Sequence, residues 1–324
     1  MLRIGILGAA DIAVESMLLP VSRRNDALVV AVASRSAGAE YARKHGIDRS
    51  YDTYEALLAD PEIDLVYNAL PPSAHAEWSI AALRAGKHVL CEKPFTMTAA
   101  EASRVLQAAR ATDRRVVEAF HDHYHPLSAW IRETVSSGRL GAVRRADAVF
   151  TGANAFVPNT LRHEPALGGG ALMDLGCYPV HWLRALFGDA PQVREAKAEL
   201  NPAGADRVID ARLSFDDEVE ATVHASMAEG VQLRSSLSIE AERGILEVDN
   251  IVFPSAGHSI RFVLDDVPHR CTVAGRQTYD HQLEAVVAAL RTGDPLPTEG
   301  ADSVSNMTVI DEIYAAAGFD RPWM

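Results

Sequence analysis

The first third of the chain alternates between two hydrophobic periods, and this alternation restricts the possible folds more than any other feature. Short apolar runs typical of strands lie at residues 2–7, 28–33, 65–70, 88–91 and 116–120. Helical patterns separate these runs, with apolar residues at the i, i+3, i+4, i+7 spacing, as at Ala102, Val105, Leu106 and Ala109. Strand–helix–strand repetition with short connections predicts a doubly wound parallel sheet.

The period changes after Gly141. At residues 219–227 apolar and polar side chains alternate strictly, and the pattern returns at 209–215 and 233–239. This alternation predicts a large, mostly antiparallel sheet with one covered face, and an open face with apolar members indicates a subunit partner. Helices are expected at 127–137, 173–187 and 279–290. We therefore expect an α/β chain with two domains, a nucleotide-binding domain at 1–121 and an α+β domain at 122–324.

Composition excludes several classes of partner. The 324 residues include 31 basic and 44 acidic side chains, a formal net charge of −13. Binding to nucleic acid or to an anionic membrane surface needs clustered Lys and Arg, so both are disfavoured. No apolar run approaches the ~20 residues that span a bilayer, and the short apolar start followed by Asp11 is not a signal peptide. The 3 scattered cysteines form neither a metal-ligand spacing nor an even disulfide set. We expect a cytoplasmic protein.

The first strand leads into a turn that fits the dinucleotide-binding fingerprint. Gly8 takes its first glycine position, Ala10 the second and Ala13 the third. Phosphates then sit on the N–H groups at the start of the following helix, which adds the neighbouring Ala9, Asp11 and Ile12 to the predicted cofactor site. The second strand ends in Ser34-Arg35 with no acidic residue, which favours NADP(H) over NAD(H); a surface arginine is the alternative.

Two further turns follow strands and complete the predicted cofactor cleft. Leu70, Pro71 and His75 come after the strand at 65–70, and Glu92 and Lys93 come after the strand at 88–91. In open α/β sheets, ligands bind outside the carboxyl ends of the strands. Both turns are therefore candidates for contact with the nicotinamide half, although a lysine at a strand end is often only a surface residue.

Three segments together carry a family resemblance: the Gly8 turn, Gly-Lys-His-Val-Leu-Cys-Glu-Lys-Pro at 86–94, and Gly-Gly-Gly-Ala-Leu-Met-Asp-Leu-Gly-Cys-Tyr-Pro at 168–179. The chain resembles, over essentially its full length, the Gfo/Idh/MocA oxidoreductases, and among them the dimeric dihydrodiol dehydrogenases and NADP-dependent D-xylose dehydrogenases. The resemblance implies a Rossmann cofactor domain, a catalytic Lys93 that holds the reacting oxygen, and a cis Lys93–Pro94 peptide. It also implies a homodimer, or a dimer of dimers, formed through the open sheets.

Hydride transfer needs a proton donor or acceptor, and Tyr178 is our candidate, as in the dihydrodiol and sugar-dehydrogenase branch. A phenol with a pKa of about 10 is a poor base at neutral pH, but a neighbouring Lys93 ammonium would lower that pKa. Asp174, at i−4 on the same expected helix face, would orient the substrate hydroxyl or the Lys–Tyr pair. A packed aromatic is the alternative for Tyr178, and His181 is then the substitute acid/base.

The stretch around His121, His123 and His125 is the most unusual local composition. An extended backbone would put the three rings on one face. Lining of the substrate pocket, structural or solvated histidines, and a transition-metal site are all open, and we predict no metal. Arg162, before the triple glycine, is a further substrate candidate, with an exposed salt bridge as the alternative.

The expected function is NADP(H)-dependent oxidoreduction of a secondary alcohol or ketone in a sugar-like or cyclic diol substrate. A cofactor-binding sensor without turnover and an NAD-dependent glycosidase are the alternatives within the family. The presence of both Lys93 and Tyr178 favours an enzyme, because a sensor has no need of a proton-transfer pair.

Overall fold

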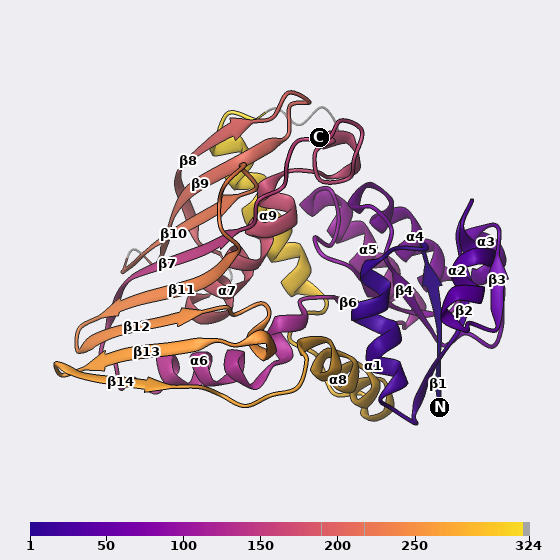
Figure 1. Cartoon of the computed structure of the whole chain (residues 1–324), viewed down its shortest axis with the longest axis horizontal. Helices are drawn as coiled ribbons and strands as arrows, with labels where there is room; N and C mark the ends of the chain where they lie inside the picture. The colour runs from indigo at the N-terminus through magenta and orange to yellow at the C-terminus, as the bar shows by residue number, and fades with distance from the viewer. Residues whose placement is uncertain (189, 217, 320–324) are drawn as a thin grey trace. The chain divides into compact units, whose positions relative to one another are not determined.

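The computed structural model describes residues 1–188, 190–216 and 218–319, which form two compact units (Figure 1). The first unit contains Met1–His121 and Tyr279–Val304; the second contains Asp122–Thr278 and the described chain from Ser305 onward. The chain crosses from one unit to the other after residue 121, as in the predicted division. The return of Tyr279–Val304 to the first unit departs from the predicted 122–324 domain.

The first unit is built on a 6-stranded sheet with the order β3-β2-β1-β4-β5-β6. Its strands are β1 Leu2–Leu7, β2 Ala27–Ala33, β3 Arg49–Tyr51, β4 Leu65–Asn68, β5 His88–Cys91 and β6 Val116–Glu118. Each neighbouring pair is parallel, which confirms the predicted doubly wound sheet. The order reverses between β1 and β4, and open α/β sheets bind ligands at such a switch point, outside the carboxyl ends of the strands.

Helices connect these strands and cover the sheet. They are the π-helical turn Val14–Leu18 with α1 Leu19–Ser22, then α2 Gly38–His45, α3 Tyr54–Leu58, α4 Pro72–Arg84, α5 Ala99–Thr112 and the late α8 Thr278–Thr292. The returning α8 belongs here because Leu283, Val286 and Val287 pack into the same buried cluster as Ile4 and Ile6.

The return is also fixed by polar contacts. The Arg115 guanidinium pairs with the Glu299 carboxylate at 2.7 Å, and the Thr298 hydroxyl donates to the Glu118 carbonyl at 2.8 Å. The amphipathic stripe of α8 predicts a buried face, but a stripe does not say which core covers it. For this reason the sequence pattern placed Tyr279–Val304 in the second domain, whereas the structure places it in the first unit.

The second unit is built on an 8-stranded sheet with the order β14-β13-β12-β11-β7-β10-β9-β8. Its strands are β7 Val143–Thr151, β8 Gln192–Leu200, β9 Asp206–Phe215, β10 Val219–Ser226, β11 Arg234–Ala241, β12 Gly244–Asp249, β13 Ser259–Leu264 and β14 Val267–Cys271. Neighbours are antiparallel except β7 and β10, which are parallel. The predicted, mostly antiparallel sheet is therefore confirmed.

Helices cover one face of this sheet. They are α6 Pro126–Ser136, α7 Cys177–Phe187 with the π-helical turn Leu172–Gly176 before it, and α9 Ala301–Ala316; 3-10 turns lie at His121–Tyr124, Pro165–Leu167 and Pro254–Ala256. On β10, Ala221 and Ala225 are buried whereas Glu220 is exposed, as the alternation predicts. A Cβ added to Gly176 would lie 3.2 Å from the Ala225 Cβ, so small residues on both sides let the helix approach the sheet closely.

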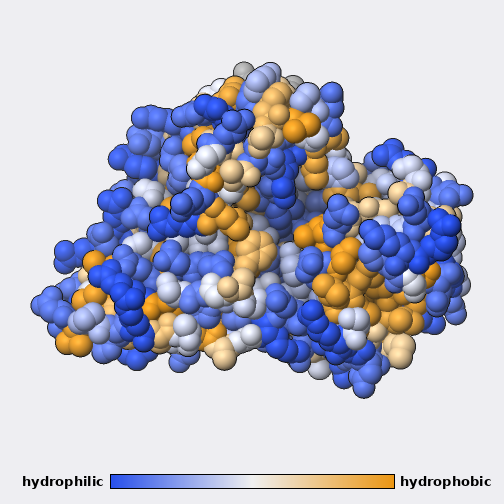
Figure 2. All heavy atoms as spheres, viewed as in Figure 1, coloured by the Kyte–Doolittle hydropathy of each residue, from blue (hydrophilic) through white to orange (hydrophobic). Residues whose placement is uncertain are grey.

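The opposite face of the sheet is lined by charge pairs between neighbouring strands. Arg212 pairs with Glu195 at 3.1 Å, and His224 contacts Asp210 at 2.7 Å. Charged residues therefore take several outward positions, whereas Ile245 is an exposed apolar residue on β12. In Figure 2, hydrophilic residues cover much of the visible surface, and hydrophobic residues gather in patches between them. Among the described residues, no helix has the length and apolar character required to cross a membrane.

Candidate active site

The turn after β1 has the geometry of a phosphate cradle. Gly8 has φ +96°, and a Cβ added there would lie 3.1 Å from the Ala69 carbonyl oxygen, so this position requires glycine. The Ala10 carbonyl accepts a hydrogen bond from the Tyr41 hydroxyl at 3.2 Å, which ties the turn to α2. Asp11 and Ile12 are exposed at the start of the following helix. Backbone N–H groups here can bind an anion.

The end of β2 lies at the same edge of the sheet. The Ser34 hydroxyl accepts from the Ala37 N–H at 3.3 Å and shapes the turn. Arg35 is exposed, and within the described chain no side-chain hydrogen bond or ion pair of its guanidinium is found. A cation at this strand end is well placed for a phosphate on the 2′-oxygen of a bound ribose.

His75 is buried between the turn after β4 and the turn after β5. Its Nδ1 lies 2.9 Å from the Pro94 carbonyl and its Nε2 lies 2.7 Å from the Leu70 carbonyl. Burial lowers the pKa of His75 to about 4, so the ring is neutral at pH 7. A neutral imidazole has one N–H and donates to only one of these two carbonyls, so the ring lies between the Leu70–Pro71 and Lys93–Pro94 turns inside the protein with one hydrogen bond to them.

The buried His75 ring predicts an acid-sensitive fold. Its pKa falls from 6.5 to about 4 on folding; the unfolded chain therefore binds the proton first as the pH drops. As the pH falls from 6.5 to about 4, the free energy of unfolding should therefore decrease by about 3 kcal/mol because of this one ring. We expect His75→Gln to remove this part of the pH dependence in urea unfolding measured from pH 7 to pH 4. His269→Gln, at an exposed ring on β14, is the control; equal pH slopes for wild type and His75→Gln would contradict the assignment.

Glu92, Lys93 and Pro94 follow β5, and the Lys93–Pro94 peptide is cis, as the resemblance implies. The buried Tyr67 hydroxyl donates to Glu92 Oε1 at 2.5 Å and also contacts the Ser16 hydroxyl at 2.6 Å. Burial and the Glu92 carboxylate raise the pKa of Tyr67 well above its usual value, so the phenol keeps its proton. These contacts tie the Glu92 side chain, next to Lys93, to β4 and to the first helical turn.

The Lys93 backbone N–H donates to Glu92 Oε2 at 3.3 Å. Burial, and to a lesser degree the Lys93 ammonium, lower the pKa of His121 to about 3, and the His121 ring contacts the Tyr279 ring with centroids 4.0 Å apart. Sequence reasoning missed Tyr67 and Tyr279. Tyr67 lies within a buried apolar strand, and Tyr279 comes close only through the return of α8.

In the second unit, Tyr178 and Asp174 lie on one continuous helical segment. The Cys177 N–H bonds to the Leu172 carbonyl, five residues back, which widens the helix to a π-helical turn. The regular helix begins at Cys177, so Pro179 falls in its first turn, as the sequence requires. The wide turn changes the simple i, i+4 relation that the sequence predicts between Asp174 and Tyr178.

The environments of these two side chains differ. Tyr178 is buried, and its ring meets Phe150 edge-on with centroids 5.4 Å apart. Asp174 is half-buried, and its Oδ2 pairs with the Arg162 Nε at 2.8 Å. The structure thus joins two predicted site residues, Arg162 and Asp174, in an ion pair, the alternative that the sequence left open for Arg162.

The triple glycine before this helix is explained by close packing. A Cβ added to Gly169 would lie 2.6 Å from the Leu161 carbonyl oxygen. The Gly170 N–H donates to the Arg162 carbonyl at 3.0 Å. These contacts hold the loop that carries Arg162 against the start of the helix that carries Asp174.

The backbone of the histidine run is not extended, because residues His121–Tyr124 form a 3-10 turn, so the condition for three rings on one face is not met. The three rings therefore point to separate surroundings. His125 Nδ1 accepts from the Leu127 N–H at 3.0 Å and caps α6, and the His123 ring lies 5.1 Å from the His181 ring. Within the described residues, no group of three or more His, Cys, Asp or Glu side chains is arranged to hold a metal ion.

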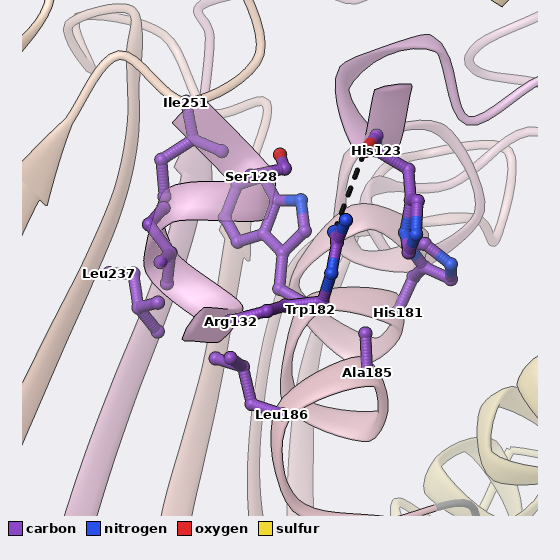
Figure 3. A pocket seen from close by; sticks show the side chains of 10 residues that line it. His123, Ser128, Arg132, His181, Trp182, Ala185, Leu186, Leu237 and Ile251 are labelled. Carbon is purple, nitrogen blue, oxygen red and sulfur yellow. Dashed lines mark hydrogen bonds between the residues drawn. The ribbon is translucent and has the colours of Figure 1, made fainter. Parts of the chain in front are cut away.

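His123 and His181 line a small cavity with Arg132 and Trp182 between α6 and α7 (Figure 3). Its volume is about 20 Å³, which is room for about one water molecule. The Trp182 Nε1–H donates to the buried Asp122 Oδ2 at 2.6 Å, and burial raises the pKa of Asp122. This cavity is too small for a sugar, so the two histidines form a packed cluster within the second unit.

The chain is similar to one family of known proteins along most of its length. Residues 2–120 match the family described as "Oxidoreductase family, NAD-binding Rossmann fold", and residues 128–247 match the GFO/IDH/MocA C-terminal domain. The chain belongs to the Gfo/Idh/MocA oxidoreductase family. The resemblance inferred from the three motifs is therefore confirmed, and the chain is an oxidoreductase.

Relatives in this family cover nearly the whole chain. An NADP(+)-dependent D-xylose 1-dehydrogenase of Haloferax volcanii is 33% identical over 97% of this chain and 96% of the relative. A trans-1,2-dihydrobenzene-1,2-diol dehydrogenase of Macaca fuscata fuscata is 30% identical over 99% and 98%. A 3-ketoreductase from Actinomadura kijaniata, solved with NADP and TDP-benzene, superposes with a TM-score of 0.90 at 25% identity, covering 97% of both chains. That ketoreductase was also solved as a tyrosine-to-phenylalanine variant and as a lysine-to-alanine variant.

Proposed function

We propose that this Gfo/Idh/MocA protein is an NADP(H)-dependent enzyme that interconverts a secondary alcohol and a ketone in a sugar-like or cyclic diol substrate. The observation that carries the proposal is the switch point of the parallel sheet, where the strand order reverses between β1 and β4. The Gly8 turn, Arg35 and the buttressed Lys93 all lie at the carboxyl ends of its strands. The named activities of the D-xylose dehydrogenase and ketoreductase relatives support the same reaction class.

The residues at this edge of the sheet fit the cofactor. Gly8 approaches the Ala69 carbonyl closely, and the half-buried Ala9 and Ala10 that follow it would bind the pyrophosphate through their backbone N–H groups. The Arg35 guanidinium would meet the 2′-phosphate, and Leu70, Pro71 and Glu92 lie in turns that would flank the nicotinamide half. When bound, the nicotinamide supplies the site that gives or takes the hydride.

We assign the movement of the proton to side chains of this chain. Tyr178 would give a proton to the substrate oxygen during reduction and take it back during oxidation, which is general acid–base catalysis by a phenol. The Lys93 ammonium would bind the same oxygen and stabilise negative charge on it and on the phenolate. Asp174, held by Arg162 at 2.8 Å, would orient a neighbouring substrate hydroxyl. The tyrosine and lysine variants of the ketoreductase concern the same pair of residue types.

The loss of NADPH absorbance with a panel of ketosugars and cyclic ketones tests the proposal, together with NADPH formation from aldoses and diols. We expect turnover with at least one substrate class and a strong preference for NADP(H). Tight NADPH binding without turnover of any substrate would favour the cofactor-binding sensor instead. Glycoside cleavage without net consumption of the cofactor would favour the glycosidase.

Arg35→Ala tests the cofactor preference. Loss of a charge-assisted contact to one phosphate should weaken NADPH binding about 10- to 100-fold while NADH binding stays unchanged. Fluorescence titration with both cofactors measures the effect, and Arg43→Ala, at an exposed arginine on α2, is the matched control. An equal loss for NADH and NADPH would contradict the assigned role.

We also propose that the chain forms a homodimer through the open face of the 8-stranded sheet. We further propose that the protein works in the cytoplasm. Light scattering coupled to size exclusion measures the assembly directly. A mass of twice 35.0 kDa, or of four times that value for a dimer of dimers, is expected. A monomer at micromolar concentration would exclude a stable dimer.

A further inference from the structure

The helical segment that carries Asp174 and Tyr178 begins next to the buried carboxylate of Asp206, a residue of β9. The Leu172 N–H donates to Asp206 Oδ2 at 2.7 Å. The Asp174 N–H already bonds to the Gly170 carbonyl at 2.9 Å, so Leu172 lies among the first N–H groups of the helix. Such groups have no acceptor within their own helix. Asp206, the first residue of β9, supplies one.

Asp206 is also held from its other side. The Tyr314 hydroxyl, on α9, donates to Asp206 Oδ1 at 2.8 Å, and both side chains are buried. A negative charge beside the N-terminus of a helix is favoured by the helix dipole, and hydrogen bonds to a charged acceptor are the stronger ones. One carboxylate therefore joins β9 and α9 to the start of the helix that carries Tyr178.

The turn that presents Asp206 holds the Arg162 loop as well. In the β8–β9 connection, Asn201 Oδ1 accepts from the N–H groups of Ala203 and Ala205 at 2.9 and 3.1 Å. Asn201 Nδ2 donates to the His163 carbonyl at 3.1 Å, next to Arg162. The same connection thus supports both members of the Arg162–Asp174 ion pair, one through the loop and the other through the helix.

Gly170 packs closely against the Asp206 carboxylate. It has φ +132°, a conformation that favours glycine, and a Cβ added there would collide with the Asp206 carboxylate. The triple glycine therefore gives room to the carboxylate as well as to the Arg162 loop. No chemical feature of Asp206 in the sequence indicates this contact, because its partners lie 34 and 108 positions away.

We propose that Asp206, secured by Tyr314, is a positioning residue for the redox reaction, an inference that rests on the proposed function. Tyr178 follows Leu172 by six residues, about 9 Å along a helix axis. A tilt or shift at the helix start is therefore passed on to the Tyr178 hydroxyl. It also moves Asp174, which lies in the first turn, away from Arg162.

The test compares Asp206→Ala, Asp206→Asn and Tyr314→Phe, with Asp210→Ala as control. Asp210 is an exposed aspartate on the same strand, paired with His224. The asparagine keeps an acceptor for Leu172, and its amide nitrogen can donate to the Tyr314 hydroxyl. We would measure kcat per folded enzyme, the KM for NADPH, the isotope effect with deuterated cofactor, and hydrogen exchange of residues 172–178.

We expect Asp206→Ala to lower kcat per folded enzyme by about 100-fold, the cost of a small misplacement of a reacting group. Tyr314→Phe, which removes one hydrogen bond, should lower it about tenfold. The KM for NADPH should stay unchanged, because the residues assigned to the cofactor belong to the first unit. The isotope effect on kcat should rise, exchange at 172–178 should accelerate, and Asp206→Asn should recover most of the lost rate.

Wild-type kcat per folded enzyme in both Asp206→Ala and Tyr314→Phe would overturn the proposal. If Asp206→Ala does not fold, Tyr314→Phe alone settles the matter, since it removes a single hydroxyl. If the wild-type enzyme turns over no substrate, the proposed function fails. Hydrogen exchange at residues 172–178 then still tests the positioning, and exchange rates unchanged from wild type would overturn it.

Discussion

Tyr178→Phe is expected to lower kcat by about 10²- to 10⁴-fold, the usual contribution of a positioned general acid or base. The phenylalanine ring keeps the edge-on contact with Phe150, at 5.4 Å between centroids in the wild type, so the packing of the buried ring should survive. Only the hydroxyl that would exchange a proton with the substrate is lost. NADPH binding should therefore stay at its wild-type strength in a fluorescence titration.

A second tyrosine provides the control for this substitution. Tyr54 is also buried and also meets an aromatic ring edge-on, that of Trp78 at 4.8 Å. Tyr54→Phe removes one hydroxyl from a similar packed ring outside the proposed site, and we expect full activity. If Tyr178→Phe keeps the wild-type rate, Tyr178 is only a packed aromatic and the acid/base must lie elsewhere.

The pH dependence of kcat adds a further readout of the same experiment. An essential phenol gives a limb to the profile at the pH where it titrates in the complex. We expect that limb in the wild type and in Tyr54→Phe, and not in the residual activity of Tyr178→Phe. A limb that persists unchanged in Tyr178→Phe would assign the titration to another group.

The sequence was sufficient for the parts of the fold that depend on local periodicity. Buried parallel strands such as β1 and β5 are short apolar runs, and β9 and β10 alternate strictly, so both classes can be recognised from neighbouring residues alone. The return of Tyr279–Val304 could not be recognised in this way. A stripe such as Leu283 and Val286 predicts a buried face but does not name the core that covers it.

The candidate site also contains residues that local sequence reveals and residues whose contacts lie far apart in the sequence. Gly8 and the Glu92-Lys93-Pro94 segment are sequence motifs because the chemistry needs those residue types at fixed spacing. The residues that hold them in place carry no such spacing. Tyr67 binds Glu92 across 25 positions and Asp206 binds Leu172 across 34, and neither contact leaves a periodic pattern in the sequence.

The histidine run shows how a composition can mislead. An alternating His-x-His-x-His predicts rings on one face only if the backbone is extended. In the structure, two contacts favour a 3-10 turn over an extended backbone at this position. His125 must reach the start of α6 to cap it, and the Asp122 carboxylate must reach the Trp182 indole at 2.6 Å. Both contacts depend on partners beyond the run itself.

Lys93→Met is the second substitution with a large expected effect. Methionine has a similar length but no charge, so the variant loses the ammonium that would stabilise charge on the substrate oxygen and on the Tyr178 phenolate. Removal of one such preorganised donor lowers kcat by about 10²- to 10³-fold. Since the phenolate also loses its cationic neighbour, the pH limb assigned to Tyr178 should move to higher pH.

The fold should tolerate this change. The Glu92 carboxylate remains bonded to the Tyr67 hydroxyl at 2.5 Å, and the backbone N–H at position 93 still donates to Glu92 Oε2 at 3.3 Å. NADPH binding and the thermal midpoint are therefore expected to stay near wild type. Lys44→Met, at an exposed lysine on α2, should leave both the rate and the pH limb unchanged. A Lys93→Met enzyme with a lowered rate but an unmoved limb would separate the two roles, because Lys93 would then bind the substrate oxygen without acting on the phenol.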